Sequence, residues 1–363
     1  MSSAPSTIKG INVTRLDIPL HVPFGIAGGV QAAANNVLVT VMLADGTRGL
    51  GEAAPLPAYN GETQQQAFDL LLAANDRVVG RDIRAWREIG TDFAMHPGPT
   101  CGSARCALET ALLDAMCRHD RVPMWKFFGG AGTGLETDMT ITTGTAGEAR
   151  AGAAEIRQRG IRVIKVKIGG AEGIAADMAR LRAIREAAPD APLILDGNAG
   201  LTRDGATELV TALKAAGIAP ALLEQWLPKD DLAGMSALAR ESGWAVAADE
   251  SVRTVEDVAR IADAGAAQIV NIKLMKAGIG AALDVAQAAR ARGLELMIGG
   301  NVESILGLTT SACFAAGLGG FRYADLDTQW FMAANPFAGG FSARGGMLSL
   351  AAITAGHGVD LGA

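Results

Sequence analysis

The segment VIKVKIGG (Val163–Gly170) alternates apolar residues with two lysines and ends in a pair of glycines. A period of two residues is typical of a β-strand, and the glycines predict where the strand stops. Side chains two residues apart lie on one face of a strand, so we expect Lys165 and Lys167 side by side near its C-terminal end. Two like charges on one face of so apolar a strand are costly, and the chain must have a use for them.

Seven more apolar runs share the chain with this one, and stretches rich in alanine with a helical pattern separate them. Strands that alternate with helices predict a parallel sheet, and eight of them predict a (β/α)8 barrel of the TIM type. The predicted strands cover residues 137–144, 163–169, 192–198, 220–226, 244–251, 268–274, 294–300 and 321–327.

The first part of the chain has a different texture. Residues 11–52 resemble antiparallel strands with a turn at Asp45-Gly46, and a helix over 103–119 with Ser103 as its N-cap follows later. We therefore predict an α+β domain over residues 1–130 and a barrel domain over 131–334. The glycine-rich residues from about 335 to 363 are expected to return to the N-terminal domain.

Composition excludes several classes of protein. With 363 residues and 49% hydrophobic residues, a large core is expected, and a net charge of −6 argues against binding to nucleic acid. The N-terminal segment has no apolar stretch typical of a secretory signal, and the apolar runs are too short to span a membrane. The four cysteines have no zinc-ligand spacing, so we expect a cytoplasmic protein with reduced thiols.

Charged residues end the predicted barrel strands at intervals of 24 to 29 residues, which is about one βα unit. Catalytic residues of such barrels lie where the strands end, so these charges are expected to form a ring around one mouth. The ring would contain Lys165, Lys167, Asp196, Glu224, Asp249, Lys273, Asp325 and Asp327.

Asp196, Glu224 and Asp249 end three consecutive strands and together suit a hard divalent cation such as Mg²⁺. Taken singly, each could instead cap a helix or pair with an arginine. Lys167 and Lys273 would face each other across the mouth as acid/base groups. A lysine acts as a base only when its pKa falls from about 10.4 towards 7–8, and burial, a neighbouring cation and a metal all favour that fall.

These residues resemble the enolase superfamily, muconate lactonizing enzyme subgroup, over nearly the whole chain. The K-x-K pair, the three strand-end carboxylates and the lysine of NIKL (271–274) carry the resemblance, and YADLD (323–327) is similar to the D-x-D motif of dipeptide epimerases. The resemblance implies that the N-terminal domain caps the barrel and that Asp196, Glu224 and Asp249 bind Mg²⁺. It also implies that Lys167 and Lys273 remove and return the α-proton on opposite faces of the α-carbon, through a metal-stabilised enolate.

The resemblance further implies the substrate contacts. Asp325 and Asp327 would accept hydrogen bonds from a substrate α-ammonium, and Lys165 would contact the substrate carboxylate and lower the pKa of Lys167. Thr140 and Gly300 are the remaining substrate-binding residues that it implies.

The resemblance also implies that two loops of the capping domain, 23–30 and 54–63, set specificity. The first has no basic residue, which disfavours an acidic side chain on the substrate. Trp226, Trp330 and Phe331 either line an aromatic pocket or pack in the core.

The predicted function is that of a Mg²⁺-dependent epimerase of dipeptides that inverts an α-carbon. The alternatives within the subgroup are muconate cycloisomerase, o-succinylbenzoate synthase, N-acylamino acid racemase and proline-betaine epimerase. A barrel that binds a ligand without catalysis is the alternative from another class, and the complete set of lysines and carboxylates disfavours it. The expected partners are a small-molecule substrate, a dipeptide or another amino-acid derivative, and further copies of the chain in a homo-oligomer.

Overall fold

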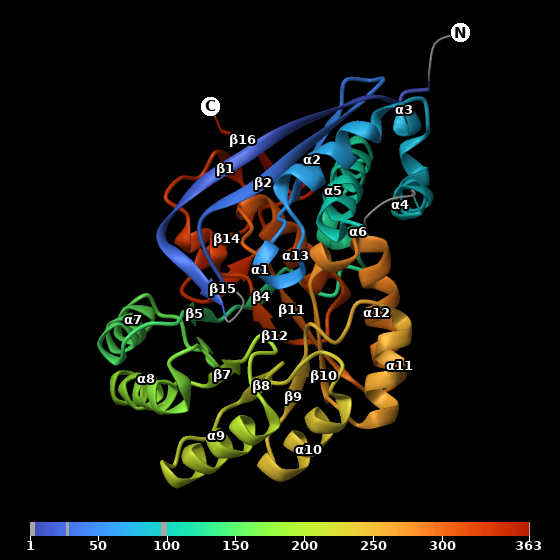
Figure 1. Cartoon of the computed structure of the whole chain (residues 1–363). Coiled ribbons are helices and arrows are strands. Elements are labelled where there is room, and N and C mark those ends of the chain that lie inside the picture. The colour runs from blue at the N-terminus through green and yellow to red at the C-terminus, as the bar shows by residue number, and fades with distance from the viewer. Residues whose placement is uncertain (1–3, 27–28, 96–99, 363) are drawn as a thin grey trace.

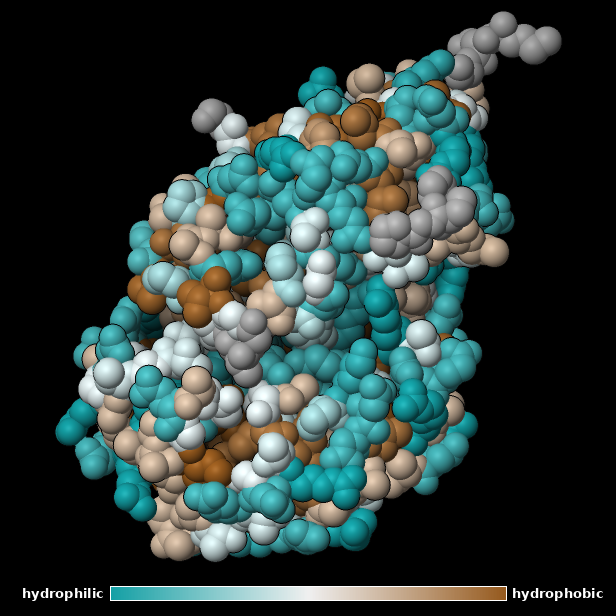
Figure 2. Space-filling view, viewed as in Figure 1, coloured by the Kyte–Doolittle hydropathy of each residue, from teal (hydrophilic) through white to brown (hydrophobic). Residues whose placement is uncertain are grey.

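The computed structural model describes the chain apart from residues 1–3, 27–28, 96–99 and 363. Figure 1 shows a barrel with an outer layer of helices, and a second body of long strands and helices lies across one end of it. On the face shown in Figure 2, hydrophilic residues predominate and apolar residues form separate patches. No helix in the described part of the chain is long and apolar enough to cross a membrane.

The N-terminal sheet is antiparallel, in the order β1-β2-β3. The turn predicted at Asp45-Gly46 is present: Thr47 N donates to Asp45 Oδ1 at 2.8 Å, and Gly46 has φ +88°. Helix α5 packs so closely on β3 that a Cβ on Gly51 would lie 2.0 Å from the carbonyl oxygen of Ala107. The elements are β1 (Ile8–Ile26), β2 (Gly29–Leu43), β3 (Arg48–Ala53) and α5 (Gly102–His119).

The prediction that Ser103 caps this helix is wrong. The helix begins at Gly102, and the Glu62 carboxylate accepts the Gly102 N–H at 2.7 Å and the Ser103 N–H at 3.1 Å. A carboxylate at a helix N-terminus satisfies free N–H groups and favours the helix dipole, so Glu62 takes the expected role of Ser103. The other helical elements of this part are α1 (Pro57–Asn60), α2 (Gln64–Ala73), α3 (Asn75–Val78), η1 (Ile83–Ala85), α4 (Trp86–Ala94) and α6 (Met124–Phe127).

The barrel confirms the predicted fold class. Its eight strands are parallel neighbours in chain order, and Asp138 N donates to Ala324 O at 3.0 Å, which brings the first and last strands together. The strands are shorter than the predicted runs because several polar residues at their ends have left the hydrogen-bonded ladder. They are β5 (Met139–Ile141), β6 (Ile164–Lys167), β7 (Leu193–Asp196), β8 (Leu222–Glu224), β9 (Val246–Ala248), β10 (Ile269–Ile272), β11 (Glu295–Gly299) and β12 (Phe321–Asp325).

Helices surround the barrel, and their apolar faces cover the strands (Figure 1). A separate apolar layer inside the barrel contains Ile194, Leu222, Ala247, Ile269 and Met297. The helical elements are α7 (Ala146–Gln158), α8 (Gly173–Ala187), α9 (Arg203–Ala215), α10 (Leu232–Ser242), α11 (Val255–Ala264), η2 (Leu274–Lys276), α12 (Ile279–Ala291), α13 (Ile305–Leu318) and η3 (Thr328–Phe331).

After the barrel, the chain contacts the N-terminal domain again through a group that we call the C-terminal clasp: Asp114, Arg118, His357 and Asp360. Asp114 accepts the backbone N–H of His357 at 2.9 Å, and Arg118 pairs with Asp360 at 2.7 Å. The boundaries at residues 130 and 334 stay predictions. The remaining strands are β4 (Gly134–Glu136), β13 (Phe337–Gly339), β14 (Ser342–Arg344), β15 (Met347–Ser349) and β16 (Val359–Leu361).

Candidate active site

The predicted lysines and metal ligands meet at one mouth of the barrel. Lys167, Asp196 and Glu224 are the last residues of β6, β7 and β8, and they are aligned with one another across the sheet. Asp249 and Lys273 follow β9 and β10 by one residue. All five side chains are buried, because the N-terminal domain covers this end of the barrel (Figure 1).

Carboxylates separate the two lysines of the VIKVKIGG strand. Lys165 Nζ lies 2.9 Å from Asp196 Oδ2 and 2.8 Å from Glu224 Oε2, and Lys167 Nζ lies 2.6 Å from the same Asp196 oxygen. Burial raises the pKa of Asp196, but the two lysines outweigh it and hold that pKa well below its usual range. The like-charge cost seen in the sequence is therefore offset by a shared anion.

Lys165 is fully buried among carboxylates. Burial lowers the pKa of this lysine, but the negative charges of Asp196 and Asp325 outweigh burial and raise it well above its usual range. Lys165 therefore stays charged, which suits binding of an anion better than proton abstraction. For Glu224, burial and the neighbouring Asp196 raise the pKa to about 7.

On the other side of the mouth, Lys273 is held between a carboxylate and an aromatic ring. Its Nζ lies 2.9 Å from Asp249 Oδ2 and 4.5 Å from the centre of the Tyr59 ring, and the Tyr59 hydroxyl donates to Asp249 Oδ1 at 3.1 Å. Burial lowers the pKa of Lys273, yet Asp249 outweighs burial and raises it above its usual range. This direction is opposite to the one that a general base needs, so Lys273 requires a change in the charge of Asp249 to act as a base.

Three neighbours of the site were missed in the sequence. Asn271 Nδ2 donates to Glu224 Oε1 at 2.8 Å, and Lys276 Nζ lies 2.7 Å from Asp249 Oδ1. Both belong to the NIKLMK stretch (271–276) around Lys273, so their position next to a predicted site residue could have identified them. Tyr59 comes from α1 of the N-terminal domain, and no spacing in the sequence links it to the barrel.

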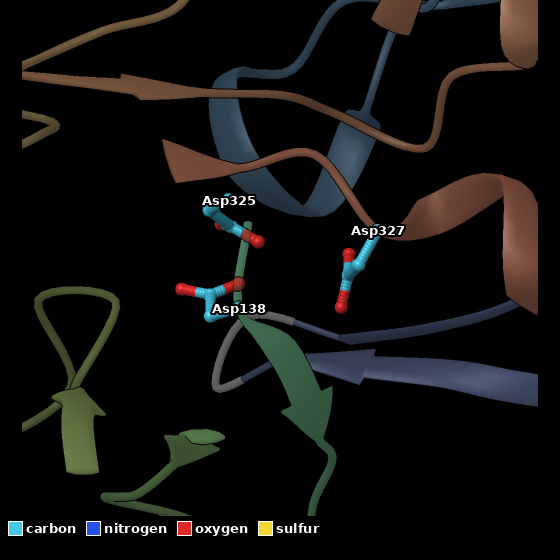
Figure 3. Close-up of side chains that lie close together, drawn as sticks. All are labelled: Asp138, Asp325 and Asp327. Carbon is cyan, nitrogen blue, oxygen red and sulfur yellow. The ribbon is translucent and has the colours of Figure 1, made fainter. Parts of the chain in front are cut away.

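A second acidic group lies beside the first. Asp325 ends β12, Asp327 precedes η3 and Asp138 precedes β5, and each offers an oxygen within 4.8 Å of the others. Figure 3 shows the three carboxyl groups turned towards one another. This buried acidic group could hold a metal ion or another cation. Asp138 was missed in the sequence, although it lies two residues before Thr140 and so on the same strand face.

The three carboxylates of this second group differ in how many of their oxygens have a hydrogen-bond or ion-pair partner. Lys165 Nζ lies 2.6 Å from Asp325 Oδ2, and Thr140 N donates to Asp327 Oδ2 at 2.6 Å. Both oxygens of Asp138 and Oδ1 of Asp327 are buried without a hydrogen-bond partner. Burial, and next the charge of Asp325, raises the pKa of Asp327 to about 7 and that of Asp138 well above its usual range.

The last predicted contact, Gly300, follows β11 directly. A Cβ at this position would lie 3.1 Å from Leu308 Cδ2 and 3.2 Å from Glu303 Oε1, so a larger residue has little room.

An apolar cluster borders the mouth from the side of the N-terminal sheet. The rings of Phe24 and Phe331 meet edge to face at 5.5 Å. Trp226 is not part of this cluster, because it is fully buried and its Nε1 donates to Leu195 O at 2.9 Å. Trp330 packs partly buried against the main core. The apolar cluster contains Ile18, Phe24, Ala34, Leu56, Val302 and Met332, with Tyr59 and Phe331 packed against it.

Segment 23–30 was expected to be a loop, but its described residues belong to strands. Gly25 pairs with Val30 in the hairpin of β1 and β2, and residues 27–28 lie outside the described residues. A Cβ on Gly25 would lie 3.0 Å from Thr143 Oγ1, just beyond β5. The C-terminal end of β1 therefore lies close to the barrel mouth (Figure 1).

Comparison with known families gives two matches that together span most of the chain. Residues 9–129 match the N-terminal domain of the mandelate racemase/muconate lactonizing enzyme family. Residues 148–362 match the model described as enolase C-terminal domain-like.

Two curated relatives are similar over most of their length. The chain is 52% identical to an aromatic dipeptide epimerase of Herpetosiphon aurantiacus, with 98% of this chain and 99% of that protein covered. It is 38% identical to a hydrophobic dipeptide epimerase of Citrifermentans bemidjiense, with 86% and 87% covered.

Solved structures give the same picture. A mandelate racemase/muconate lactonizing enzyme from Roseiflexus sp. superposes with a TM-score of 0.94 at 52% identity, with 99% of each chain covered. A dipeptide epimerase from Enterococcus faecalis, solved with Mg and the dipeptide L-Leu-L-Tyr, superposes with a TM-score of 0.92 at 29% identity, with 98% of this chain and 99% of that chain covered.

Proposed function

The chain belongs to the mandelate racemase/muconate lactonizing enzyme family of the enolase superfamily and is a dipeptide epimerase, and we propose that it uses Mg²⁺ and two lysines to invert an α-carbon. The observation that carries the mechanism is the position of Lys167 and Lys273, on β6 and just beyond β10, with three carboxylate-bearing strands between them. Two acid/base groups on opposite sides of one α-carbon are what inversion requires.

Asp196, Glu224 and Asp249 are the proposed Mg²⁺ ligands. Their oxygens suit a hard cation, and all three carboxylates are buried, with lysine ammonium groups in contact with Glu224 Oε2 at 2.8 Å and Asp249 Oδ2 at 2.9 Å. When bound, the metal would supply the positive charge that stabilises an enolate. Asp249 holds the proton of Lys273 through its negative charge. When Asp249 serves as a ligand, its attraction for that proton weakens, so Lys273 becomes a better base.

The other residues bind and orient the substrate. The charged Lys165 lies between Asp196 and Glu224 and is proposed to contact the substrate carboxylate. Asp325 and Asp327 are proposed to accept hydrogen bonds from the α-ammonium, with Thr140 holding Asp327 in place through its backbone N–H. Gly300 is proposed to let the substrate backbone pass close to β11.

We propose that the preferred dipeptides carry apolar or aromatic side chains. Phe24, Phe331 and their apolar neighbours border the mouth, and segment 23–30 has no basic residue for an acidic side chain. The two curated relatives are an aromatic dipeptide epimerase and a hydrophobic dipeptide epimerase, which supports the same class of substrate.

Incubation with Mg²⁺ and a dipeptide library in D₂O tests this function. Mass spectrometry should find deuterium at one α-carbon of aromatic and aliphatic dipeptides, with much less in dipeptides that end in glutamate. Deuterium in N-acyl amino acids or proline betaine, and in no dipeptide, would refute the proposal.

A further inference from the structure

Asp138 is the one member of the second acidic group that no motif brings into the site. It lies before β5, is 1% exposed, and both of its carboxylate oxygens lack a hydrogen-bond partner. Removing a carboxylate from water without a partner costs several kcal/mol, so proteins seldom retain one without a function. Its carboxyl group faces Asp325 and Asp327 (Figure 3), and those two carboxyl groups place further negative charge beside it.

The three carboxylates of this group match the three donors of a primary ammonium. Lys165 contacts Asp325 Oδ2 and the Thr140 N–H donates to Asp327 Oδ2, whereas both oxygens of Asp138 and Oδ1 of Asp327 are buried without a hydrogen-bond partner. An ammonium has three N–H donors in a tetrahedral arrangement. With N–O distances of about 2.8 Å, its acceptors lie about 4.6 Å apart. The three carboxylates each offer an oxygen within 4.8 Å of the others, which accommodates that spacing.

We infer that Asp138 is a third substrate-binding carboxylate, which together with Asp325 and Asp327 binds the α-ammonium at the N-terminus of the dipeptide. This inference rests on the proposed function. It gives the enzyme a chemical reason to reject N-acylated substrates, because an amide nitrogen cannot supply three donors and a positive charge to three carboxylates.

The experiment compares two ligands that differ only in the ammonium: L-Phe-L-Phe and its desamino analogue, 3-phenylpropionyl-L-Phe. With Mg²⁺ present, Asp138→Asn should raise the KM for L-Phe-L-Phe about 10- to 100-fold, because a charge-assisted hydrogen bond is lost. The inhibition constant of the desamino analogue should change less than about twofold, since it has no ammonium to lose. Asp327→Asn is the positive control and should show the same selectivity.

Three results would overturn the inference. Equal weakening of both ligands would give Asp138 a structural role only. A weaker Mg²⁺ affinity of Asp138→Asn in calorimetry, without loss of selectivity between the ligands, would make the group a metal site. Unchanged kinetics with L-Phe-L-Phe would show that Asp138 has no contact with substrate.

Two further measurements keep the inference testable. If Asp138→Asn does not fold, Asp138→Ser replaces it, because serine keeps one acceptor and removes the charge. The wild-type enzyme is measured in parallel: if it exchanges no α-hydrogen of any dipeptide, the proposed function fails. If the wild type is active and Asp138→Asn shows no selective loss, only the role of Asp138 fails.

Discussion

The barrel mouth and the C-terminal clasp both bury charged side chains, but these side chains differ in how completely they are hydrogen-bonded. In the clasp, Asp114 accepts hydrogen bonds from the N–H groups of Leu50 and His357 and from Arg118 Nε. His357 is equally satisfied, because its Nε2 lies 3.0 Å from Leu50 O and its Nδ1 accepts the Val359 N–H. At the mouth, both oxygens of Asp138 and Oδ1 of Asp327 lack such partners.

This difference separates groups that hold the fold from groups that hold a ligand. A satisfied buried network adds rigidity, whereas an unsatisfied one costs stability until a cation or substrate completes it. Changes at the mouth should therefore appear mainly in rate and affinity, and changes in the clasp mainly in the free energy of unfolding. Three predictions can break or sharpen that contrast.

The largest effect is expected at the mouth, for Lys273→Ala and Lys167→Ala. Each variant lacks one of the two acid/base groups, so epimerisation should fall by at least 10²- to 10⁴-fold. Each should still exchange the α-hydrogen of one of the two diastereomers with D₂O, and the two variants should exchange opposite diastereomers. NMR of each pure diastereomer follows the exchange. If either variant exchanges both diastereomers at the wild-type rate, the two-base mechanism is wrong.

A smaller effect is expected in the clasp, for Asp114→Ala. Arg118 and the N–H groups of Leu50 and His357 lose their shared acceptor, so the free energy of unfolding should fall by about 3 kcal/mol. Urea unfolding measures this loss, and kcat/KM of the folded variant should stay within about twofold of wild type. Asp360→Ala is the matched control, because it removes an exposed partner of Arg118 and should cost less than about 1 kcal/mol. A large fall in kcat/KM for Asp114→Ala would contradict the division between the two regions.

The smallest effect concerns pH. Burial lowers the pKa of His357 below its usual 6.5, although Asp114 opposes this. As the pH falls, the histidine of the unfolded chain binds a proton before that of the folded chain does. The contribution of His357 to the free energy of unfolding is therefore fully present above about pH 6.5 and is lost as pH falls towards the depressed pKa. Between pH 7 and 5.5 the loss is at most about 1.3 kcal/mol, the limit for a histidine that binds no proton in the folded chain. His357→Gln should have a correspondingly flatter pH dependence in urea unfolding, and a profile parallel to wild type would exclude His357 as the source.

Local patterns in the sequence were enough for the barrel and for most of the mouth. Lys167, Asp196 and Glu224 recur at one βα unit and end apolar runs, so the parallel topology brings them to one end. Tyr59 could not be placed in this way, because its contact with Lys273 depends on how two domains pack. Asp138 was missed for a different reason, since nothing in the sequence shows whether a buried carboxylate has a partner.

The contact of Tyr59 with Lys273 and Asp249 has a consequence for how such enzymes diversify. Segment 54–63 was expected to select the substrate, yet its tyrosine also contacts a proposed base and a proposed metal ligand. Exchanging this segment between relatives to obtain a new specificity would therefore also alter the proton transfer. Selectivity and turnover are linked through one aromatic ring. An exchange of segment 54–63 that keeps Tyr59 is therefore more suited to changing selectivity without loss of turnover.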